Sequence, residues 1–271
     1  MRFMAAMVAV LMFALGSSLA QAQGSVEVQW LGQAAMKITT PGGKVILIDP
    51  FLTKNPKTPA QYKNLDAVGK IDLILVTHAH GDHLGDAPEL SAKNNAKIIA
   101  PNGLSLSLIE LGVVKPAQVL RMNKSGTVSP IGPGVKVTMV SAEHSSELSH
   151  RNPSTGKDEI HVGGEAAGFI VELENGFKIW HMGDTGLFGD MKTIAEIYKP
   201  DLVMMPIGGH FTMGPVEAAL ATREWIKPRF VIPMHYGTFA FLKGTPQEYK
   251  QALGQSNTRV LVLNPGDVAG F

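Results

Sequence analysis

The sequence predicts a layered α/β fold, and three observations carry that prediction. Short runs of β-branched and apolar residues alternate with stretches of helical spacing along most of the chain. No internal repeat, low-complexity tract or linker interrupts this alternation. The 271 residues are 45% hydrophobic and 17% charged, which is enough apolar material for one large core. Strands interleaved with helices are typical of sheets whose outer faces are covered by helices.

The expected strands begin with an early hairpin. Val26–Thr39 and Lys44–Asp49 are predicted as strands joined at the turn Pro41-Gly42-Gly43. Further β-rich runs predict strands at Asp72–Thr77, Lys97–Ala100, Val135–Val140, Ala167–Leu173, Phe177–His181, Leu202–Pro206, Phe230–Pro233 and Arg259–Leu263.

Helices are expected between these strands. Their predicted ranges are Asp86–Asn94, Leu104–Leu111, Met191–Tyr198, Pro215–Ile226 and Pro246–Leu253. Pro215 suits a first helical turn, where its missing N–H costs nothing. The polar segment Glu147–Gly164 has no clear periodicity and is interpreted as an active-site loop or lid, with an inert surface loop as the alternative.

Residues 1–22 have the pattern of a secretory signal peptide. Arg2 supplies the positive start, Phe3–Leu15 the apolar segment and Ala20-Gln21-Ala22 the small-residue cleavage site. An uncleaved membrane anchor is the alternative, but the apolar run is shorter than the roughly 20 residues that span a bilayer. We therefore expect a periplasmic or secreted protein with no stable membrane insertion after cleavage, whose single domain is formed by residues 23–271.

Charge and cysteine content narrow the range of functions. Cleavage after Ala22 removes one cation from the 24 Lys and Arg residues, which then balance the 23 Asp and Glu residues. A neutral chain argues against nucleic acid as a partner and favours a small-molecule substrate. The sequence has no cysteine, so any metal ligands must be His and carboxylate. A homo-oligomer is compatible with the sequence.

The decisive motif is Thr77-His78-Ala79-His80-Gly81-Asp82-His83, which directly follows the apolar run Leu73–Val76. Three imidazoles and a carboxylate beside a buried strand need partners, and both groups are good ligands for first-row divalent metals. Gly81 allows the backbone to turn sharply between the two pairs. The alternative is a hydrogen-bonded polar turn without metal, which would suit a lone histidine better than this cluster.

Four more polar residues occur where predicted strands end: Asp49, His144, Asp184 and His235. The carboxyl ends of strands in α/β sheets converge on one crevice, where ligands bind. Each residue alone is weak evidence, because an Asp or His at a strand end is usually a cap. Their order relative to the histidine motif is stronger evidence.

This order resembles the metallo-β-lactamase superfamily, which is known for the series Asp, HxHxDH, His, Asp, His. The resemblance covers Ser25–Phe271 and implies an αββα four-layer sandwich, with two central mixed sheets flanked by helices. Pro206–Pro215 and Pro233–Thr238 are similar to the single-domain UPF0173 metal-dependent hydrolase group, which is related to ascorbate-6-phosphate lactonases.

The resemblance also implies the role of each site residue. His78, His80 and His144 would bind one metal, Asp82, His83 and His235 a second, and Asp184 would bridge both. Two divalent ions are expected, zinc first and manganese or iron as alternatives. A bridging water would then become hydroxide near neutral pH and attack the substrate, with Asp82 and Asp184 as catalytic ligands. Asp49 would orient ligand histidines, or would simply be a buried turn residue before Pro50.

The remaining histidines divide into one catalytic candidate and three structural ones. His210 lies in a glycine-flanked loop after Leu202–Pro206 and could stabilise an oxyanion or donate a proton, or could be an ordinary loop histidine. His181 is expected to pack in the sheet, and His150 and His161 to belong to the loop. The apolar residues Phe211, Met213, Phe239 and Phe241 are expected either to line an apolar rim or to lie in the core.

The function expected from this site is hydrolysis of a small ester, lactone or phosphodiester. A phosphodiesterase or phospholipase, or a metal-loaded protein without catalysis, remain alternatives. The run His78-Ala79-His80-Gly81-Asp82 lacks the glutamate of the HxExD pattern of flavodiiron reductases. The missing cysteine argues against classical carbapenem hydrolysis by the thiolate-containing β-lactamases of this fold.

Overall fold

Two seven-stranded sheets pack face to face in the computed structural model, which describes residues 24–271. The strand order of the first sheet is β16 (Val268–Gly270), β1 (Glu27–Trp30), β2 (Met36–Thr39), β3 (Val45–Ile48), β4 (Leu73–Leu75), β5 (Lys97–Pro101) and β6 (Val119–Met122). The strands from β16 to β3 pair antiparallel, and those from β3 to β6 pair parallel.

The second sheet is mixed in the same way. Its order is β15 (Arg259–Val260), β14 (Phe230–Met234), β13 (Leu202–Pro206), β12 (Lys178–His181), β11 (Ala167–Glu172), β8 (Lys136–Ser141) and β7 (Thr127–Val128). The strands from β12 to β15 pair parallel, and β7, β8, β11 and β12 pair antiparallel.

Alternating side chains explain why both faces of each sheet are covered. In β3, Ile46 and Ile48 face the second sheet, whereas Leu47 joins the helix-covered core on the other side. In β13, Leu202 and Met204 enter the core between the sheets, and Val203 packs under the opposite helices. Because successive strand residues point to opposite faces, near-continuous apolar runs are what a strand buried on both faces requires.

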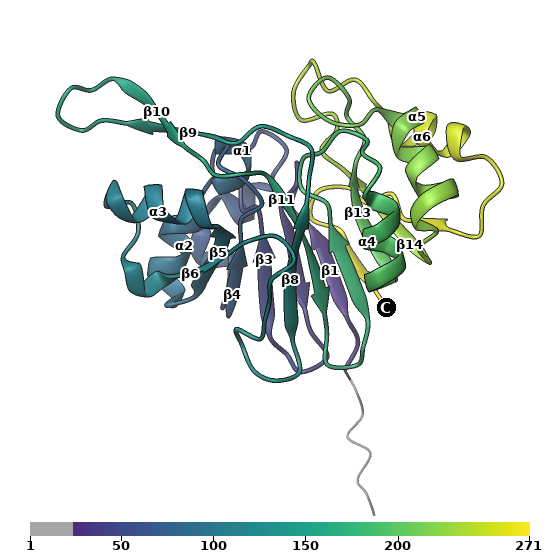
Figure 1. Cartoon of the computed structure of the whole chain (residues 1–271), viewed down its shortest axis with the longest axis horizontal. Helices are drawn as coiled ribbons and strands as arrows, with labels where there is room; N and C mark the ends of the chain where they lie inside the picture. Colours follow the sequence, from purple (N-terminus) through teal and green to yellow (C-terminus); the bar gives the residue numbers. More distant parts are fainter. Residues whose placement is uncertain (1–23) are drawn as a thin grey trace, which may run out of the picture.

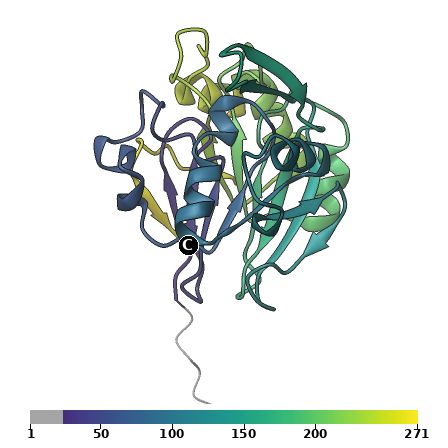
Figure 2. The same ribbon diagram turned by 90° about the vertical axis from the view of Figure 1, so that its left-hand side faces the viewer.

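Helices form the two outer layers, which completes the predicted αββα sandwich (Figure 1). On the first sheet lie α2 (Ala87–Asn94) and α3 (Asn102–Glu110), which face the viewer in Figure 2. On the second lie α4 (Met191–Tyr198), α5 (Pro215–Leu220) and α6 (Pro246–Leu253), and α5 continues as a π-helical segment, Ala221–Ile226. Thr245 and Glu248 form a capping box at the start of α6. In the part of the chain that the structure describes, every helix is too short or too polar to span a bilayer.

Two sequence predictions about local structure are wrong. Val26–Thr39 is not one strand, because the chain turns between β1 and β2, where Leu31 N donates to Ala35 O at 2.8 Å. Glu147–Gly164 is not irregular, because β9 (Glu147–Arg151) and β10 (Asp158–Val162) pair as an antiparallel hairpin. This hairpin projects from the body in Figure 1. The predicted signal peptide lies outside the described residues.

Candidate metal centre

Seven His and Asp side chains gather at the end of the sandwich where the parallel strands finish. Their ligand atoms form two groups, each with all its atoms within 4.8 Å of one another: His78, His80 and His144, and then Asp82, His83, Asp184 and His235. They come from the loop after β4, from the short helix α1 (Gly81–Leu84), and from the loops after β8, β12 and β14. The structure thus brings together every residue that the sequence predicted as a metal ligand.

The first group consists of three imidazoles, and neighbouring oxygens orient two of them. His78 Nδ1 lies 3.1 Å from Thr77 Oγ1, and His80 Nε2 lies 3.1 Å from Glu147 Oε2. These contacts leave His78 Nε2 and His80 Nδ1 facing each other at 3.0 Å. Nitrogens bound to one tetrahedral zinc at about 2.0–2.1 Å are roughly 3.3 Å apart, so the pair has the spacing of two ligands to one ion.

The second group centres on the Asp184 carboxylate. Its Oδ2 lies 3.0 Å from His235 Nε2 and 3.2 Å from His83 Nε2. Asp82 Oδ2 lies 3.5 Å from the same His235 nitrogen. Asp184 also faces the first group, since its Oδ2 is 3.7 Å from His144 Nε2. One carboxylate oxygen therefore lies between the two groups of ligands.

Asp49 holds the histidine motif from behind. Its side chain is fully buried and accepts hydrogen bonds from Thr77 N (2.8 Å), Thr77 Oγ1 (2.7 Å) and His83 Nδ1 (2.8 Å). The bond to His83 Nδ1 fixes the tautomer of that ring and leaves Nε2 to face Asp184, which is how outer carboxylates orient metal-binding histidines. The structure thus favours the orienting role that was expected for Asp49 over that of a simple turn residue.

Gln33 is a site residue that the sequence prediction missed. Its fully buried side chain donates from Nε2 to Asp82 Oδ2 at 2.8 Å, and the same nitrogen lies 2.7 Å from His235 Nε2. Gln33 occupies the turn between β1 and β2, the segment that was predicted to be continuous strand. A signal was present in Gly32, because a glycine inside a strand pattern often marks a break or a close approach.

The backbone around the site adopts conformations that side chains rarely take. Gln33, Asp49 and His235 all have positive φ angles, of 51°, 48° and 55°. Such angles cost free energy in residues other than glycine and cluster at functional sites. A Cβ on Gly208 would lie 2.1 Å from His235 O, so only glycine allows the loops after β13 and β14 to approach this closely. The ligand positions are therefore fixed by the backbone as well as by packing.

Burial and charge set different proton affinities in the two groups. Burial, followed by the charge of His83, holds the pKa of His78 well below its usual value, and burial also lowers that of His144. In the second group, burial disfavours the charged form of the imidazoles, but the attraction of the nearby carboxylates, led by the negatively charged Asp184, is the larger effect. The pKa of His83 is raised well above its usual value, and that of His235 rises to about 9. Asp184 is correspondingly held as a carboxylate, because the nearby imidazolium charges outweigh its burial and depress its pKa.

The second group contains buried polar atoms that fit a metal ion. Among the described residues, Asp184 Oδ1 is buried and has no hydrogen-bond partner, and the buried His83 Nε2 makes no hydrogen bond although Asp184 Oδ2 lies 3.2 Å from it. A buried polar group left unpaired costs about 1–3 kcal/mol, so unpaired atoms are rarely retained without a purpose. Imidazole nitrogens and carboxylate oxygens are the donors that zinc and related divalent ions take. The residues present therefore fit a metal centre.

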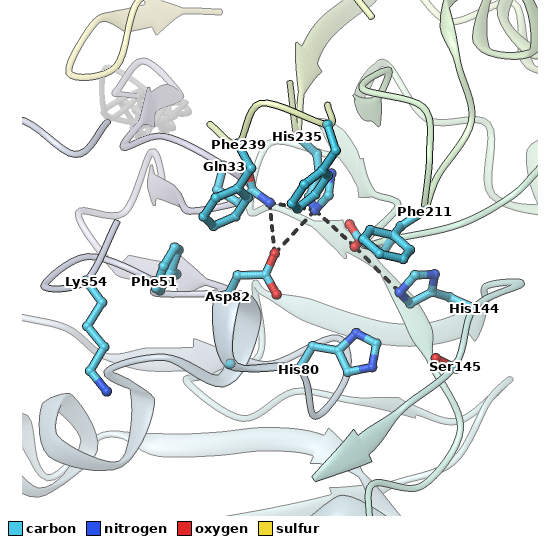
Figure 3. A pocket seen from close by; sticks show the side chains of 13 residues that line it. Gln33, Phe51, Lys54, His80, Asp82, His144, Ser145, Phe211, His235 and Phe239 are labelled. Carbon is cyan, nitrogen blue, oxygen red and sulfur yellow. Dashed lines mark hydrogen bonds and ion pairs between the residues drawn. The ribbon is translucent and has the colours of Figure 1, made fainter. Parts of the chain in front are cut away.

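The two groups lie at a cavity of about 640 Å³ (Figure 3). Asp82, His144, Asp184 and His235 line it, together with His80. The other lining residues are Gln33, Phe51, Lys54, Gly81, Ser145, Phe211, Phe239 and Phe241. A cavity of this size accommodates a small molecule.

His210, the catalytic candidate outside the two ligand groups, does not line the cavity. It is exposed, and its ring packs 4.4 Å from that of Phe211 and 5.3 Å from that of Phe241, measured between centroids. It thus contacts two residues that line the cavity, and its catalytic role stays a prediction.

The other histidines have structural contacts. His181 Nδ1 accepts from Gly183 N, and its Nε2 lies 2.9 Å from Ala34 O inside the sandwich, as expected for a packed residue. His150 and His161 lie on the β9–β10 hairpin. Met213 is buried in the core, whereas Phe211, Phe239 and Phe241 line the cavity.

Comparison with known proteins agrees with this architecture. The sequence profile of the beta-lactamase superfamily domain matches residues 44–236, so the chain belongs to the beta-lactamase superfamily. Within it, the chain belongs to the UPF0173 metal-dependent hydrolase group. It is 63% identical over 250 residues to the group's protein from Polaromonas sp., covering 92% of this chain and 91% of the relative. The protein from Methanobrevibacter smithii is 46% identical, over 89% of this chain and 95% of the relative.

Solved structures show the same fold. Igni18, a metallo hydrolase from the archaeon Ignicoccus hospitalis, superposes with a TM-score of 0.77 at 32% identity, covering 91% of this chain and 98% of that chain. The metallo-beta-lactamase fold protein YhfI from Bacillus subtilis has a TM-score of 0.67 at 12% identity, over 92% of this chain and 100% of that chain, and supports the fold alone.

Proposed function

We propose that this protein is a dinuclear metal-dependent hydrolase that cleaves a small ester, lactone or phosphodiester. The observation that carries the proposal is the position of Asp184, whose Oδ2 lies within 3.7 Å of nitrogens from both ligand groups. A carboxylate shared in this way is suited to hold two ions close together. Zinc is the metal we expect from a set of imidazoles with two carboxylates and no thiolate, and manganese or iron are alternatives.

When bound, a pair of divalent ions supplies a hydroxide nucleophile near neutral pH and polarises the scissile group. The chain's own residues position the reacting groups and move the proton. Asp184 Oδ1 is buried, has no hydrogen-bond partner among the described residues and can accept a proton. Asp82 lines the cavity, and Gln33 donates to its Oδ2, which keeps that carboxylate directed toward His235. Asp49 holds His83 in a single tautomer.

His210 is proposed only as a candidate at the rim, where it could assist the leaving group if a substrate extends past Phe211. A His210→Ala variant with full metal content and a kcat lowered at least about tenfold would support that role. The sequence features of residues 1–22 support export to the periplasm or the exterior as part of the proposal.

Turnover of generic substrates by the zinc-loaded protein tests the proposed function. p-Nitrophenyl acetate, a simple γ-lactone and bis(p-nitrophenyl) phosphate represent the three bond types. We expect hydrolysis of at least one, and its loss after chelation, with recovery when zinc is returned. Full metal content without turnover of any of them would favour a metal-loaded protein that does not catalyse, and turnover of the phosphodiester alone would favour the phosphodiesterase alternative.

A further inference from the structure

Four phenylalanines form one side of the cavity beside the metal-binding residues. Phe51 comes from the loop after β3, Phe211 from the loop after β13, and Phe239 and Phe241 from the loop after β14. The rings form a continuous series, with centroids 6.5 Å apart from Phe51 to Phe239, 5.5 Å from Phe239 to Phe241 and 5.5 Å from Phe241 to Phe211. We call these four side chains the aromatic wall.

The outer part of the aromatic wall is open to solvent. Phe211 is 56% exposed and Phe241 is 42% exposed, although apolar rings of this size gain free energy from burial. Exposed apolar patches that border a cavity commonly mark ligand-binding surfaces. The inner end, by contrast, is closed, since Phe51 is only 8% exposed. A ligand that enters the cavity would therefore cover the outer rings.

The two loops that carry the outer rings are fixed in place. Leu242, which is 3% exposed, anchors the segment between β14 and α6, and its backbone N donates to Phe239 O at 3.0 Å. Gly237 N in turn donates to Leu242 O, and Phe211 N donates to Gly209 O. The aromatic wall is thus largely formed before a ligand binds, which reduces the ordering cost of binding.

Outside the predicted metal ligands, the cavity presents little positive charge to an anionic substituent. Among the residues that the structure describes, Lys54 is the only Lys or Arg that lines it. Lys54 is exposed, and Figure 3 shows its amine directed away from the cluster of His and Asp side chains. Sites that recognise phosphate or carboxylate groups usually present several charged or bidentate donors. The aromatic wall therefore favours an uncharged group.

We propose that the substrate carries an uncharged aromatic ring or alkyl chain, which packs against Phe211, Phe239 and Phe241 while the scissile bond faces Asp82 and Asp184. This inference rests on the proposed function for the identity of the reacting group. It assigns the substrate class, an apolar ester or lactone, and it excludes a phosphorylated sugar. The aromatic wall acts on binding, whereas the metal-binding residues act on the reacting bond.

The test compares three hydroxamates, which share one metal-binding head and differ in the attached tail. Acetohydroxamate has a methyl group, 4-phenylbutanohydroxamate an aromatic ring, and the monohydroxamate of glutaric acid a carboxylate. Calorimetry on the zinc-loaded protein should show the phenyl compound binding roughly 10- to 100-fold more tightly than acetohydroxamate, the range expected for burying an apolar group of that size. The carboxylate compound should bind no more tightly than acetohydroxamate.

A double variant, Phe211→Ala with Phe241→Ala, should lose most of this preference, and its fold should persist because both side chains are exposed. Ile197→Ala, which removes a similarly exposed apolar side chain from α4, is the matched control and should keep the preference. A preference below about threefold in the wild-type protein, its survival in the double variant, or failure of both uncharged probes to bind would overturn the inference. A change of oligomeric state in the double variant without a change in preference would make the wall a subunit interface and would also overturn it.

Hydrolysis of p-nitrophenyl acetate by the same preparation keeps the two proposals separate. Turnover without preference for the phenyl compound would refute the aromatic wall and leave the hydrolase intact. Preference without turnover of any ester, lactone or phosphodiester would refute the hydrolase and leave the aromatic wall as a binding site for apolar groups.

Discussion

The two ligand groups differ in composition, in burial and in the residues that support them. The first contains only imidazoles, two of them partly exposed, and His80 contacts Glu147, a hairpin residue whose side chain is 56% exposed. The second combines two carboxylates with two buried imidazoles and is supported by the fully buried Asp49 and Gln33. Support from buried residues is more rigid and less screened by solvent than support from the surface. The second group should therefore be the more sensitive to substitution of its surroundings.

The largest effect should come from Asp184→Asn, which removes the negative charge that both groups share. We expect loss of tightly held metal from the second group, and a fall in kcat of about 10²–10⁴, the range for removing a positioned general base. Metal content and kcat should be measured on the same preparation, with Asp190→Asn as a control, because Asp190 is a surface residue before α4. Normal metal content with kcat unchanged would contradict the shared role of Asp184.

Substitution of one histidine from each group should separate the two sites. His235→Ala removes a ligand only from the second group, and His144→Ala removes one only from the first. Each variant should therefore lose one metal equivalent and retain the other. Elemental analysis after reconstitution gives the count. If either variant lost both metals while remaining folded, the sites would be a single cooperative unit and the distinction between them would fail.

Substitution of the residues that hydrogen-bond to the ligands should lower metal affinity by smaller amounts, and the loss should differ between the two groups. Asp49→Asn replaces one carboxylate oxygen with an NH2 group, which cannot accept a hydrogen bond. The fully buried side chain can then no longer accept from both Thr77 N and His83 Nδ1. Glu147→Gln keeps an oxygen that can accept from His80 at an exposed position. Outer residues typically affect metal affinity 10- to 100-fold, so we expect Asp49→Asn near the upper end and Glu147→Gln at or below about tenfold.

Competition with a coloured chelator would measure both affinities. Equal losses of metal affinity in Asp49→Asn and Glu147→Gln would show that burial of the supporting residue does not govern metal affinity here. A larger loss for Glu147→Gln would reverse the comparison and would identify the hairpin as the dominant support.

The smallest expected effect is the dependence of metal affinity on pH. The pKa of His235 is raised to about 9 in the metal-free site, so near neutral pH this imidazole carries a proton that a metal must displace. Affinity of the second site should therefore increase as the pH rises toward 9, and His83, whose pKa is also raised, should add to this dependence. The first site should show less dependence over that range, because the pKa of His78 is already depressed. Calorimetry of zinc binding in buffers of different ionisation enthalpy measures the protons released, and His235→Ala should release fewer than the wild-type protein.

The sequence was sufficient to predict a layered α/β fold and to select candidate ligands from local patterns, whereas the four-layer arrangement and the assignment of the ligands to two sites came from its resemblance to a known family. Apolar runs identify the buried strands, and the ligands follow directly at their carboxyl ends. It was insufficient for Gln33 and Glu147, whose roles arise from long-range contacts. Gln33 is 49 residues from Asp82, and Glu147 is 67 residues from His80. The hairpin that carries Glu147 was also missed, since most of its residues are solvated and lack the apolar alternation of a buried strand.

The most direct test of the account is the number of metal ions held by one wild-type chain. Protein reconstituted with zinc and freed of loosely bound metal should be assayed by elemental analysis against its concentration from quantitative amino-acid analysis. Two equivalents per chain are expected, since the two groups of ligands meet at Asp184. One equivalent or less, in folded protein with excess zinc supplied, would contradict the dinuclear centre.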